Sequence, residues 1–283
     1  MNIAKPQFQD LASAYQLHYY LCFRTKLNKP IFNSNMFAAF GPHLDTISEQ
    51  YGYHLLRWKP YENQLRLLVS LKPEHSLAVV TGRLKGNLSR LLRKQHPQLT
   101  AGQIWSRGYF AKSIGTVDQE TISRYIADQA EHHGYRGGSA SLVCAYDSPT
   151  QLPKLWRHNH ATFNLSHHMV FETQTHKEVF DDLTGKVLID YWLRVAAKKG
   201  FVIGQIRVLP NHTHLMVCLF PTMSVLDCVR ALMNNSWSMM TRRFSGVLKQ
   251  TNAWNVWEGS FYAGSTGSVT TAEVKGYLES EGS

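Results

Sequence analysis

The stretch RVLPNHTHLMVCLFP, residues 207–221, places two histidines one residue apart where a Pro-Asn corner turns into an apolar run. The alternation of residues after this corner predicts a β-strand on which His212 and His214 point to one face and Thr213 to the other. Two neutral imidazoles side by side can bind one divalent cation, and further ligands must then come from elsewhere. In a chain with 14 histidines the pair alone does not establish a metal site, so the surrounding sequence has to decide.

A second stretch has the same shape but lacks the histidines. In YENQLRLLVSLKP, residues 61–73, Gln64 and Arg66 stand where His212 and His214 stand in the first stretch. An arginine side chain is always charged and offers no acceptor, so it cannot ligate a metal. We therefore expect a polar strand face here, without a metal site.

The two stretches belong to a repeat that covers nearly the whole chain. At an offset of 148 residues, LHYYLCFRTKLNKPIF (17–32) lies over LSHHMVFETQTHKEVF (165–180) without a gap. After a four-residue insertion, an offset of 152 places residues 104–129 on residues 256–281. Matches in one order with a single shift indicate a tandem duplication of a domain of roughly 120 to 135 residues, which is a usual domain size.

The repeat divides the chain into two domains. We assign residues 1–135 to the first domain, residues 136–155 to a linker rich in Gly, Ser and Pro, and residues 156–283 to the second domain. Within each domain the hydrophobic period alternates in the order β-α-β-β-α-β-α. This order predicts an α+β fold, with two tandem ferredoxin-like (RRM-like) antiparallel sheets that each carry one extra helix.

Composition limits the class of protein. The formal net charge of +10 favours a polyanionic partner, nucleic acid first. The four cysteines show no CxxC spacing, the first residues show no signal-peptide pattern, and no apolar run approaches the length of a membrane span. These features predict a reduced, cytoplasmic protein that binds no membrane.

The sequence resembles the single-tyrosine HUH transposases of small bacterial insertion sequences, which include the TnpA type and the REP-associated tyrosine transposases. LPNHTHLMV (209–217) and VTTAEVKGYLE (269–279) carry the resemblance in the second domain, and FRTK, IWSRGYF and ISRYIADQ carry it in the first. It covers nearly the whole chain, twice. One departure is Thr213, which stands where the family has a hydrophobic residue between its histidines.

The resemblance implies one site assembled from both domains, because in this family the tyrosine helix of one subunit reaches the histidine pair of the other. It implies Tyr125 as the nucleophile. Gln129, one helical turn later on the same face, would join His212 and His214 as the third metal ligand. The two covalently linked domains would then form an intramolecular pseudo-dimer, and two such chains could dimerise further.

The same assembly pairs a possible second tyrosine, Tyr277, with the degenerate first domain. Tyr277 and Glu281 would face Gln64 and Arg66, where no metal can be held. For Tyr277 alone, the favoured interpretation is a packed helix tyrosine or a DNA contact. One of the two sites is then complete.

The resemblance also implies a reaction, the cleavage of single-stranded DNA that has hairpin or palindromic ends. Tyr125 would attack phosphorus, leaving a 5′-phosphotyrosine bond and a free 3′-hydroxyl, with Mg²⁺ or Mn²⁺ at the scissile phosphate. Another 3′-hydroxyl can reverse the attack and join strands. Two alternatives remain open: a domesticated protein that binds hairpin DNA and no longer transposes, and a nickase of the replication-initiator or relaxase type.

Basic and aromatic residues predict the DNA surface. The candidates for phosphate contacts are Arg83, Lys85, Arg90, Arg93 and Lys94 in the first domain, and Arg242 and Arg243 in the second. Charge runs of this kind are also typical of solvated helix faces. Trp105 and Trp257 can stack unpaired bases, although their equivalent places in the two domains favour a position in the core.

Overall fold

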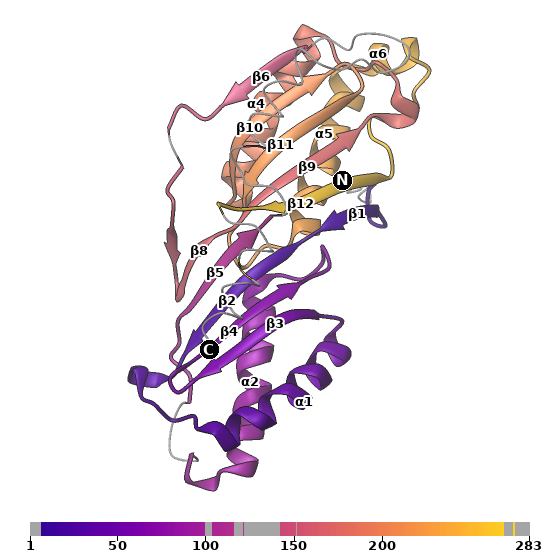
Figure 1. Cartoon of the computed structure of the whole chain (residues 1–283). Helices are drawn as coiled ribbons and strands as arrows, with labels where there is room; N and C mark the ends of the chain where they lie inside the picture. Colours follow the sequence, from indigo (N-terminus) through magenta and orange to yellow (C-terminus); the bar gives the residue numbers. More distant parts are fainter. Residues whose placement is uncertain are drawn as a thin grey trace, which may run out of the picture.

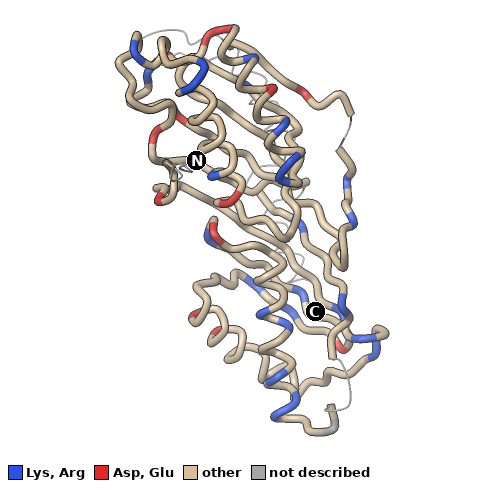
Figure 2. The backbone as a smooth tube through the Cα atoms, turned by 180° about the vertical axis from the view of Figure 1, so that it is seen from behind, with Lys and Arg blue, Asp and Glu red and all other residues tan. Residues whose placement is uncertain are grey.

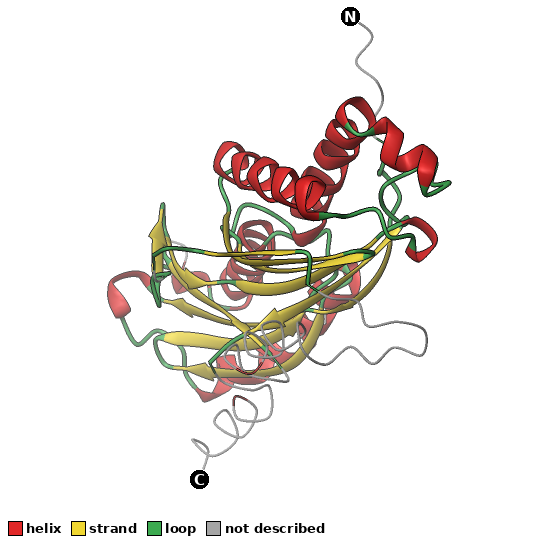
Figure 3. Cartoon of the chain, turned by 90° about the horizontal axis from the view of Figure 1, so that it is seen from above, coloured by secondary structure: helices red, strands yellow, loops and turns green. Residues whose placement is uncertain are grey.

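The computed structural model describes residues 7–99, 104–115, 121, 142–150, 152–268 and 274 (Figure 1). Two α+β domains follow one another along the chain, each built around a six-stranded sheet in which most neighbouring strands are antiparallel. Seen from above, the strands lie between two groups of helices (Figure 3). The predicted fold class is confirmed.

The elements of the first half are β1 (Ala12–Gln16), β2 (His18–Arg24), the 3-10 helix η1 (Lys26–Asn28), α1 (Ser34–Tyr51), β3 (His54–Tyr61), β4 (Gln64–Ser70), α2 (Leu77–Gln95), the 3-10 helix η2 (Pro97–Leu99) and β5 (Tyr109–Ile114). Their order is the predicted one, with the first strand divided into β1 and β2. The helix predicted after β5 lies outside the described residues, apart from Thr121.

The elements of the second half are β6 (Cys144–Asp147), β7 (Trp156–His158), β8 (Ala161–Asn164), β9 (Ser166–Glu172), the 3-10 helix η3 (Gln174–His176), α4 (Asp182–Lys199), β10 (Val202–Leu209), β11 (His212–Cys218), α5 (Val225–Arg243), α6 (Ser245–Gln250) and β12 (Ser260–Thr266). The order from β9 to β12 is the predicted one apart from α6, and the last predicted helix lies outside the described residues, apart from Val274. The strands β6, β7 and β8 were not predicted. β6 falls within the segment predicted as a linker and pairs antiparallel with β10.

Helix α1 shows how local signals and packing set the boundaries. The side chain of Asn33 caps its first turn by accepting a hydrogen bond from the Met36 amide at 3.1 Å. Gly52 ends it in the left-handed conformation, at φ +68°, which glycine adopts without strain. Pro42 lies inside the helix, where the buried apolar face outweighs the lost backbone hydrogen bond.

The two halves exchange edge strands. The first sheet has the order β3-β4-β2-β5-β8-β7 and the second has the order β1-β12-β9-β11-β10-β6. β1 runs parallel to β12 and β8 runs parallel to β5 (Figure 1). Because β1 continues into β2 and β8 continues into β9, each of these segments crosses from one sheet to the other. This exchange holds the two domains together and was not predicted from the sequence.

Equivalent residues of the repeat make reciprocal hydrogen bonds at the junction. The hydroxyl of Ser113 donates to the carbonyl of Thr266 at 2.5 Å, and the hydroxyl of Ser265 donates to the carbonyl of Ile114 at 2.6 Å. These four residues are two pairs at the repeat offset of 152. The halves therefore meet through the same contacts made in both directions, as subunits do across a two-fold axis.

One contact joins two residues that are equivalent to each other. The hydroxyl of Tyr19 and Nε2 of His167, which stand at the repeat offset of 148, are 2.8 Å apart and buried. A residue contacts its own counterpart in the other repeat only close to the pseudo-two-fold axis that relates the two repeats. The junction thus lies where β2 of the first sheet meets β9 of the second sheet.

Each sheet has one face covered by its own helices and an opposite face, which we call the distal face. On β4, Leu65, Leu67 and Val69 point into the core with α1 and α2, while Gln64 and Arg66 point to the distal face. The four cysteines are all described and none forms a disulfide. Within the described ranges, no helix has the length and apolar character needed to cross a membrane.

Candidate active site

The two histidines lie together on the distal face of the second sheet. His212 and His214 share one side of β11, and their ring centroids are 5.1 Å apart. Thr213 between them points to the opposite side and is fully buried. His214 is 5% exposed, whereas His212 is half-buried. The strand alternation read from the sequence therefore gives the correct relative placement of these side chains.

Asn211 fixes the orientation of the His212 ring. Nδ1 of His212 lies 2.7 Å from Oδ1 of Asn211. An amide oxygen only accepts, so Nδ1 must carry the proton and the lone pair of His212 lies on Nε2. The Pro-Asn corner in front of β11 thus sets the tautomer of the first histidine.

A third histidine, His168 on β9, does the same for His214. Nε2 of His168 lies 3.1 Å from Nδ1 of His214, and the two rings are stacked with an interplanar angle of 5°. Burial lowers the pKa of His168 to about 4, so its ring is neutral at neutral pH and its Nε2 can accept. The arrangement in which Nδ1 of His214 donates leaves the lone pair of His214 on Nε2.

These contacts fit a metal site. Metal-ligating histidines usually donate their second ring N–H to a neighbouring acceptor, which fixes the ring and strengthens the ligand. Among the described residues no group of three or more His, Cys, Asp or Glu side chains is arranged to hold a metal ion. The predicted site has only two such ligands, His212 and His214, and its third predicted ligand, Gln129, lies outside the described residues.

The tyrosines that the sequence nominates also lie outside the described residues. This applies to Tyr125 as well as to Tyr277 and its neighbour Glu281. Val274, three positions before Tyr277, is described: it is buried in a cluster with Leu68 of β4 and Ile114 of β5. A residue of the second repeat therefore packs on the distal face of the first sheet.

The degenerate positions occupy the matching place on that first sheet. Gln64 accepts a hydrogen bond from the thiol of Cys22 at 3.4 Å, and the guanidinium of Arg66 lies 4.5 Å from the centroid of the Tyr61 ring. Leu68, which contacts Val274, is two residues further along the same side of β4. The second repeat thus reaches the face that carries the degenerate pair.

The basic residues predicted to contact DNA lie mainly on α2, on the helix side of the first sheet (Figure 2). The guanidinium of Arg83 is 3.3 Å from the Tyr53 hydroxyl. Arg90 is exposed and donates to Asn87 at 2.8 Å, and with Lys94 it lines a groove of about 530 Å³ between α1 and α2. Arg93 is half-buried; Arg242 and Arg243 are exposed at the end of α5.

Lys85 has a different environment from the other basic residues. Its ammonium donates to the carbonyls of Ser106, Arg107 and Gly108 at 2.7, 3.2 and 3.2 Å. An ammonium group has three donors, so these contacts leave none for a phosphate. Burial lowers the pKa of Lys85 to about 8. The structure therefore makes Lys85 a support for the loop before β5, which corrects its prediction as a DNA contact.

The two tryptophans belong to the core. Trp105 and Trp257 are 2% and 1% exposed. Each forms an isolated β-bridge with a threonine of its own half, Trp105 with Thr25 and Trp257 with Thr173. Rings buried in this way cannot stack on bases. The core interpretation is confirmed and the stacking interpretation is wrong.

Sequence reasoning missed His168 and Asn211. His168 stands in SHHMVFE, which reads as an ordinary buried strand, and nothing local shows that it faces His214 on the neighbouring strand. The available signal was the alignment of the repeats, in which Tyr20 stands at the position of His168 and Arg66 at the position of His214. The two histidines are in contact, and both positions differ in the other repeat.

The chain belongs to the family described as "Transposase IS200 like", whose model matches residues 13–129 and 161–281. The two matches begin 148 residues apart and end 152 residues apart, which are the two offsets of the repeat. Members of this family are transposases, so the chain belongs to a class of DNA-processing enzymes. The tandem duplication is thus a duplication of this family's domain.

Individual relatives match one repeat each. The ISDra2 transposase TnpA of Deinococcus radiodurans is 24% identical over 119 residues, covering 42% of this chain and 85% of the relative. The transposase for insertion sequence element IS200 of Salmonella typhimurium is 26% identical over 117 residues, covering 40% and 76%. A crystal structure described as a candidate transposase from Deinococcus radiodurans is 25% identical and covers 41% of this chain and 92% of its own, with a TM-score of 0.34.

Proposed function

We propose that this protein cleaves and rejoins single-stranded DNA at one composite site, with His212 and His214 from the second repeat and Tyr125 and Gln129 from the first. Three features support this proposal: family membership, the paired histidines with both Nδ1 atoms already engaged, and the reciprocal junction between the halves. The histidine pair is the observation that carries it. One of these imidazoles is buried and the other half-buried, and each Nδ1 has a side-chain neighbour, as is usual for histidines that ligate a metal.

The contact of Val274 supports the use of a tyrosine from the opposite repeat. Val274 packs on the first sheet beside the side of β4 that carries Arg66. Its counterpart at the offset of 152 is Ile122, three residues before Tyr125. If the two-fold relation of the junction extends to these segments, Tyr125 approaches the second sheet, where His212 and His214 lie. The fused chain then has the active-site geometry of a two-subunit enzyme.

The reaction follows from these residues. Tyr125 Oη forms a bond to phosphorus while the bond from phosphorus to O3′ breaks. The proton lost by the phenol balances the proton gained by O3′, so the released strand carries a 3′-hydroxyl. A bound Mg²⁺ or Mn²⁺ supplies Lewis-acid polarisation of a non-bridging phosphate oxygen. His212, His214 and Gln129 would hold it. The 5′-phosphotyrosine bond keeps the energy of the phosphodiester, so a second 3′-hydroxyl can reverse the step.

The test is the covalent intermediate. A labelled single strand that contains a hairpin is incubated with the protein and Mn²⁺, and the adduct is separated by denaturing electrophoresis. We expect an adduct that is lost in Tyr125→Phe and retained in Tyr277→Phe. The reverse pattern contradicts the assembly across repeats and favours a tyrosine used within its own repeat. Tight hairpin binding without any adduct favours the domesticated DNA-binding protein.

A further inference from the structure

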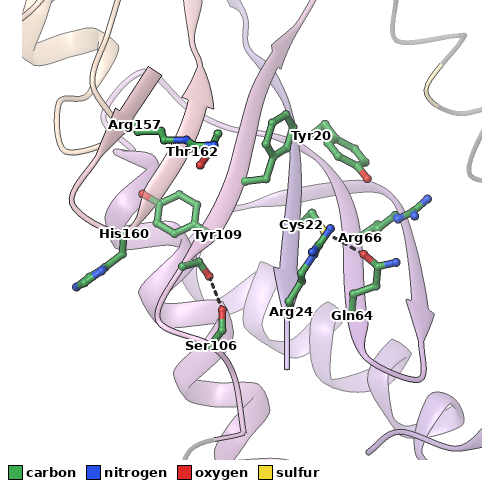
Figure 4. A pocket seen from close by; sticks show the side chains of 12 residues that line it. Tyr20, Cys22, Arg24, Gln64, Arg66, Ser106, Tyr109, Arg157, His160 and Thr162 are labelled. Atoms are coloured by element: carbon green, nitrogen blue, oxygen red, sulfur yellow. Dashed lines mark hydrogen bonds between the residues drawn. The ribbon is translucent and has the colours of Figure 1, made fainter. Parts of the chain in front are cut away.

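The distal face of the first sheet contains a cavity of about 650 Å³ (Figure 4). Gln64 and Arg66 line this cavity. The cavity therefore lies at the position on the first sheet that is equivalent to the position of His212 and His214 on the second sheet. β2, β4 and β5 form its floor, while Arg157 and Thr162, on the β7 and β8 strands of the second half, form part of its wall. The volume lies within the range of small-molecule pockets, ~300–1,000 Å³.

The lining of this cavity is cationic. Three arginines, Arg24, Arg66 and Arg157, contribute guanidinium groups, and none of the described lining residues is an aspartate or a glutamate. Arginine is suited to phosphate because its planar fork can donate two parallel hydrogen bonds and its charge does not titrate. The cavity is thus prepared for an anion over the whole physiological pH range.

The thiol in the cavity adds no negative charge. Burial raises the pKa of Cys22, against the opposing influence of Arg24 and Arg66. The thiol donates to Gln64, so the groups between the arginines are neutral. Among the described lining residues an anion meets positive charge and hydrogen-bond donors without a competing carboxylate or thiolate; Glu281, predicted to face Arg66, lies outside the described residues.

Aromatic rings stand beside the arginines. Tyr20 and Phe110 lie edge to face with centroids 6.1 Å apart, and both line the cavity together with Tyr109. Every nucleobase has a π-face that stacks on such rings with little regard for sequence. Cationic groups next to aromatic rings, in a cavity of this size, match a nucleotide: its phosphate with the arginines and its base with the rings.

The loop before β5 is held in place as part of this cavity. Ser106 and Gly108 line it, and Lys85 donates to the carbonyls of both. The half-buried ammonium therefore fixes one rim of the cavity from behind the sheet. A rim held by three charge-assisted hydrogen bonds is a preorganised wall, which lowers the entropy lost on binding.

We propose that this cavity binds one nucleotide of the single-stranded DNA substrate without any metal ion. Arg66, at the position of the second histidine, supplies permanently the positive charge that a cation would supply on the other sheet. The inference rests on the proposed function, since it takes single-stranded DNA as the substrate, and it assigns the degenerate site a role in holding a strand that is not cut.

The test measures binding in EDTA, where the metal site cannot contribute. The probe is a dye-labelled hexathymidylate, and its affinity is followed by fluorescence anisotropy at fixed salt. We expect Arg66→Gln to weaken binding about tenfold, as the loss of one hydrogen-bonded charge does. The matched control is Arg194→Gln on α4, which removes the same charge from an exposed helix position and should change the affinity less than about twofold.

A second readout locates the probe. Alkylation of Cys22 by iodoacetamide is followed by mass spectrometry, with Cys144 as the internal control, because both thiols are half-buried and burial raises the pKa of each. We expect hexathymidylate in EDTA to slow the alkylation of Cys22 and not that of Cys144. An unchanged rate at Cys22, or equal affinities for Arg66→Gln and wild type, overturns the proposal.

The two proposals fail separately. Loss of the covalent adduct in every substrate removes the cleavage function and leaves metal-independent binding to be measured on its own. Equal affinity of Arg66→Gln and wild type in EDTA removes the nucleotide site and leaves the adduct test untouched. His212→Ala should abolish the adduct without changing binding in EDTA, which separates the two faces within one protein.

Discussion

The distal faces of the two sheets began as the same structure and now carry different chemistry. The equivalent strands β4 and β11 each follow an asparagine, Asn63 in one half and Asn211 in the other. On the second sheet the two outward side chains are imidazoles, whereas on the first they are an amide and a guanidinium. The difference shows that one distal face can lack the histidine pair while the fold, the junction and the strand register stay intact.

The neighbouring strand has changed together with the ligands. His168, which contacts His214, corresponds to Tyr20, and Glu172 corresponds to Arg24. Two of the three arginines that line the cavity, Arg24 and Arg66, thus stand where the second half has Glu172 and His214. The first face is therefore more positively charged than the second at these equivalent positions.

The largest effect is expected from copying the first face onto the second. His214→Arg places the residue of the degenerate strand in the intact site, where it removes one ligand and adds a fixed positive charge. We expect the initial rate of adduct formation with Mn²⁺ to fall roughly a thousandfold or more. His176→Arg, the same change at an exposed position on η3, is the control and should keep the rate. Cleavage by the arginine variant would show that the histidine pair does not hold the cation.

A smaller effect is expected from the histidine behind the site. His168→Tyr gives β9 the residue that the first half has at this position, and removes the ring nitrogen that lies 3.1 Å from Nδ1 of His214. Loss of such a partner commonly weakens metal binding 10- to 100-fold. Titration calorimetry with Mn²⁺ in the absence of DNA measures this directly. His176→Tyr, at an exposed position on η3, should bind Mn²⁺ as the wild type does; equal losses in both variants would assign the effect to stability.

The sequence could predict the elements of each half because their signals are local. Asn33 and Gly52 mark the ends of α1, and alternation in β11 places its histidines correctly. It could not predict the exchange of β1 and β8, because nothing within a strand specifies a partner more than a hundred residues away. It missed His168 for the same reason: a strand pattern gives the face of a side chain but not its neighbour across the sheet.

The junction between the halves should respond to acid. Burial lowers the pKa of His167 to about 4, below the value near 6.5 of an unfolded histidine. The unfolded chain therefore binds the proton more readily, and the stability present above pH 6.5 is lost as the pH falls toward 4. We expect His167 to reduce the free energy of unfolding by about 2 kcal/mol between pH 7 and pH 5.

Urea unfolding at the two pH values measures this loss. His168 titrates in the same window, since burial lowers its pKa to about 4 as well, so the wild type should lose more than the contribution of His167. The free energy of unfolding of His167→Gln should fall between pH 7 and pH 5 only by the part that other groups such as His168 contribute. A variant with the same pH dependence as the wild type would mean that His167 is protonated without breaking its contact with Tyr19 at the junction.

The smallest effect concerns the residue between the two histidines. Thr213 is fully buried, and its hydroxyl has no hydrogen-bond partner among the described residues. Leu65 holds the equivalent place on β4, where it is also fully buried. Replacing an unsatisfied buried hydroxyl by a methyl group of the same shape removes a desolvation cost, so Thr213→Val should raise the free energy of unfolding by about 1 kcal/mol.

This gain distinguishes two explanations for the threonine. If the hydroxyl only reflects drift on the core side of β11, Thr213→Val is more stable and its Mn²⁺ affinity is unchanged. If the hydroxyl positions the strand for the histidines, the valine variant binds Mn²⁺ more weakly although it is more stable. Calorimetric titration and urea unfolding of the same sample separate these outcomes, because the two faces of one strand are then measured independently.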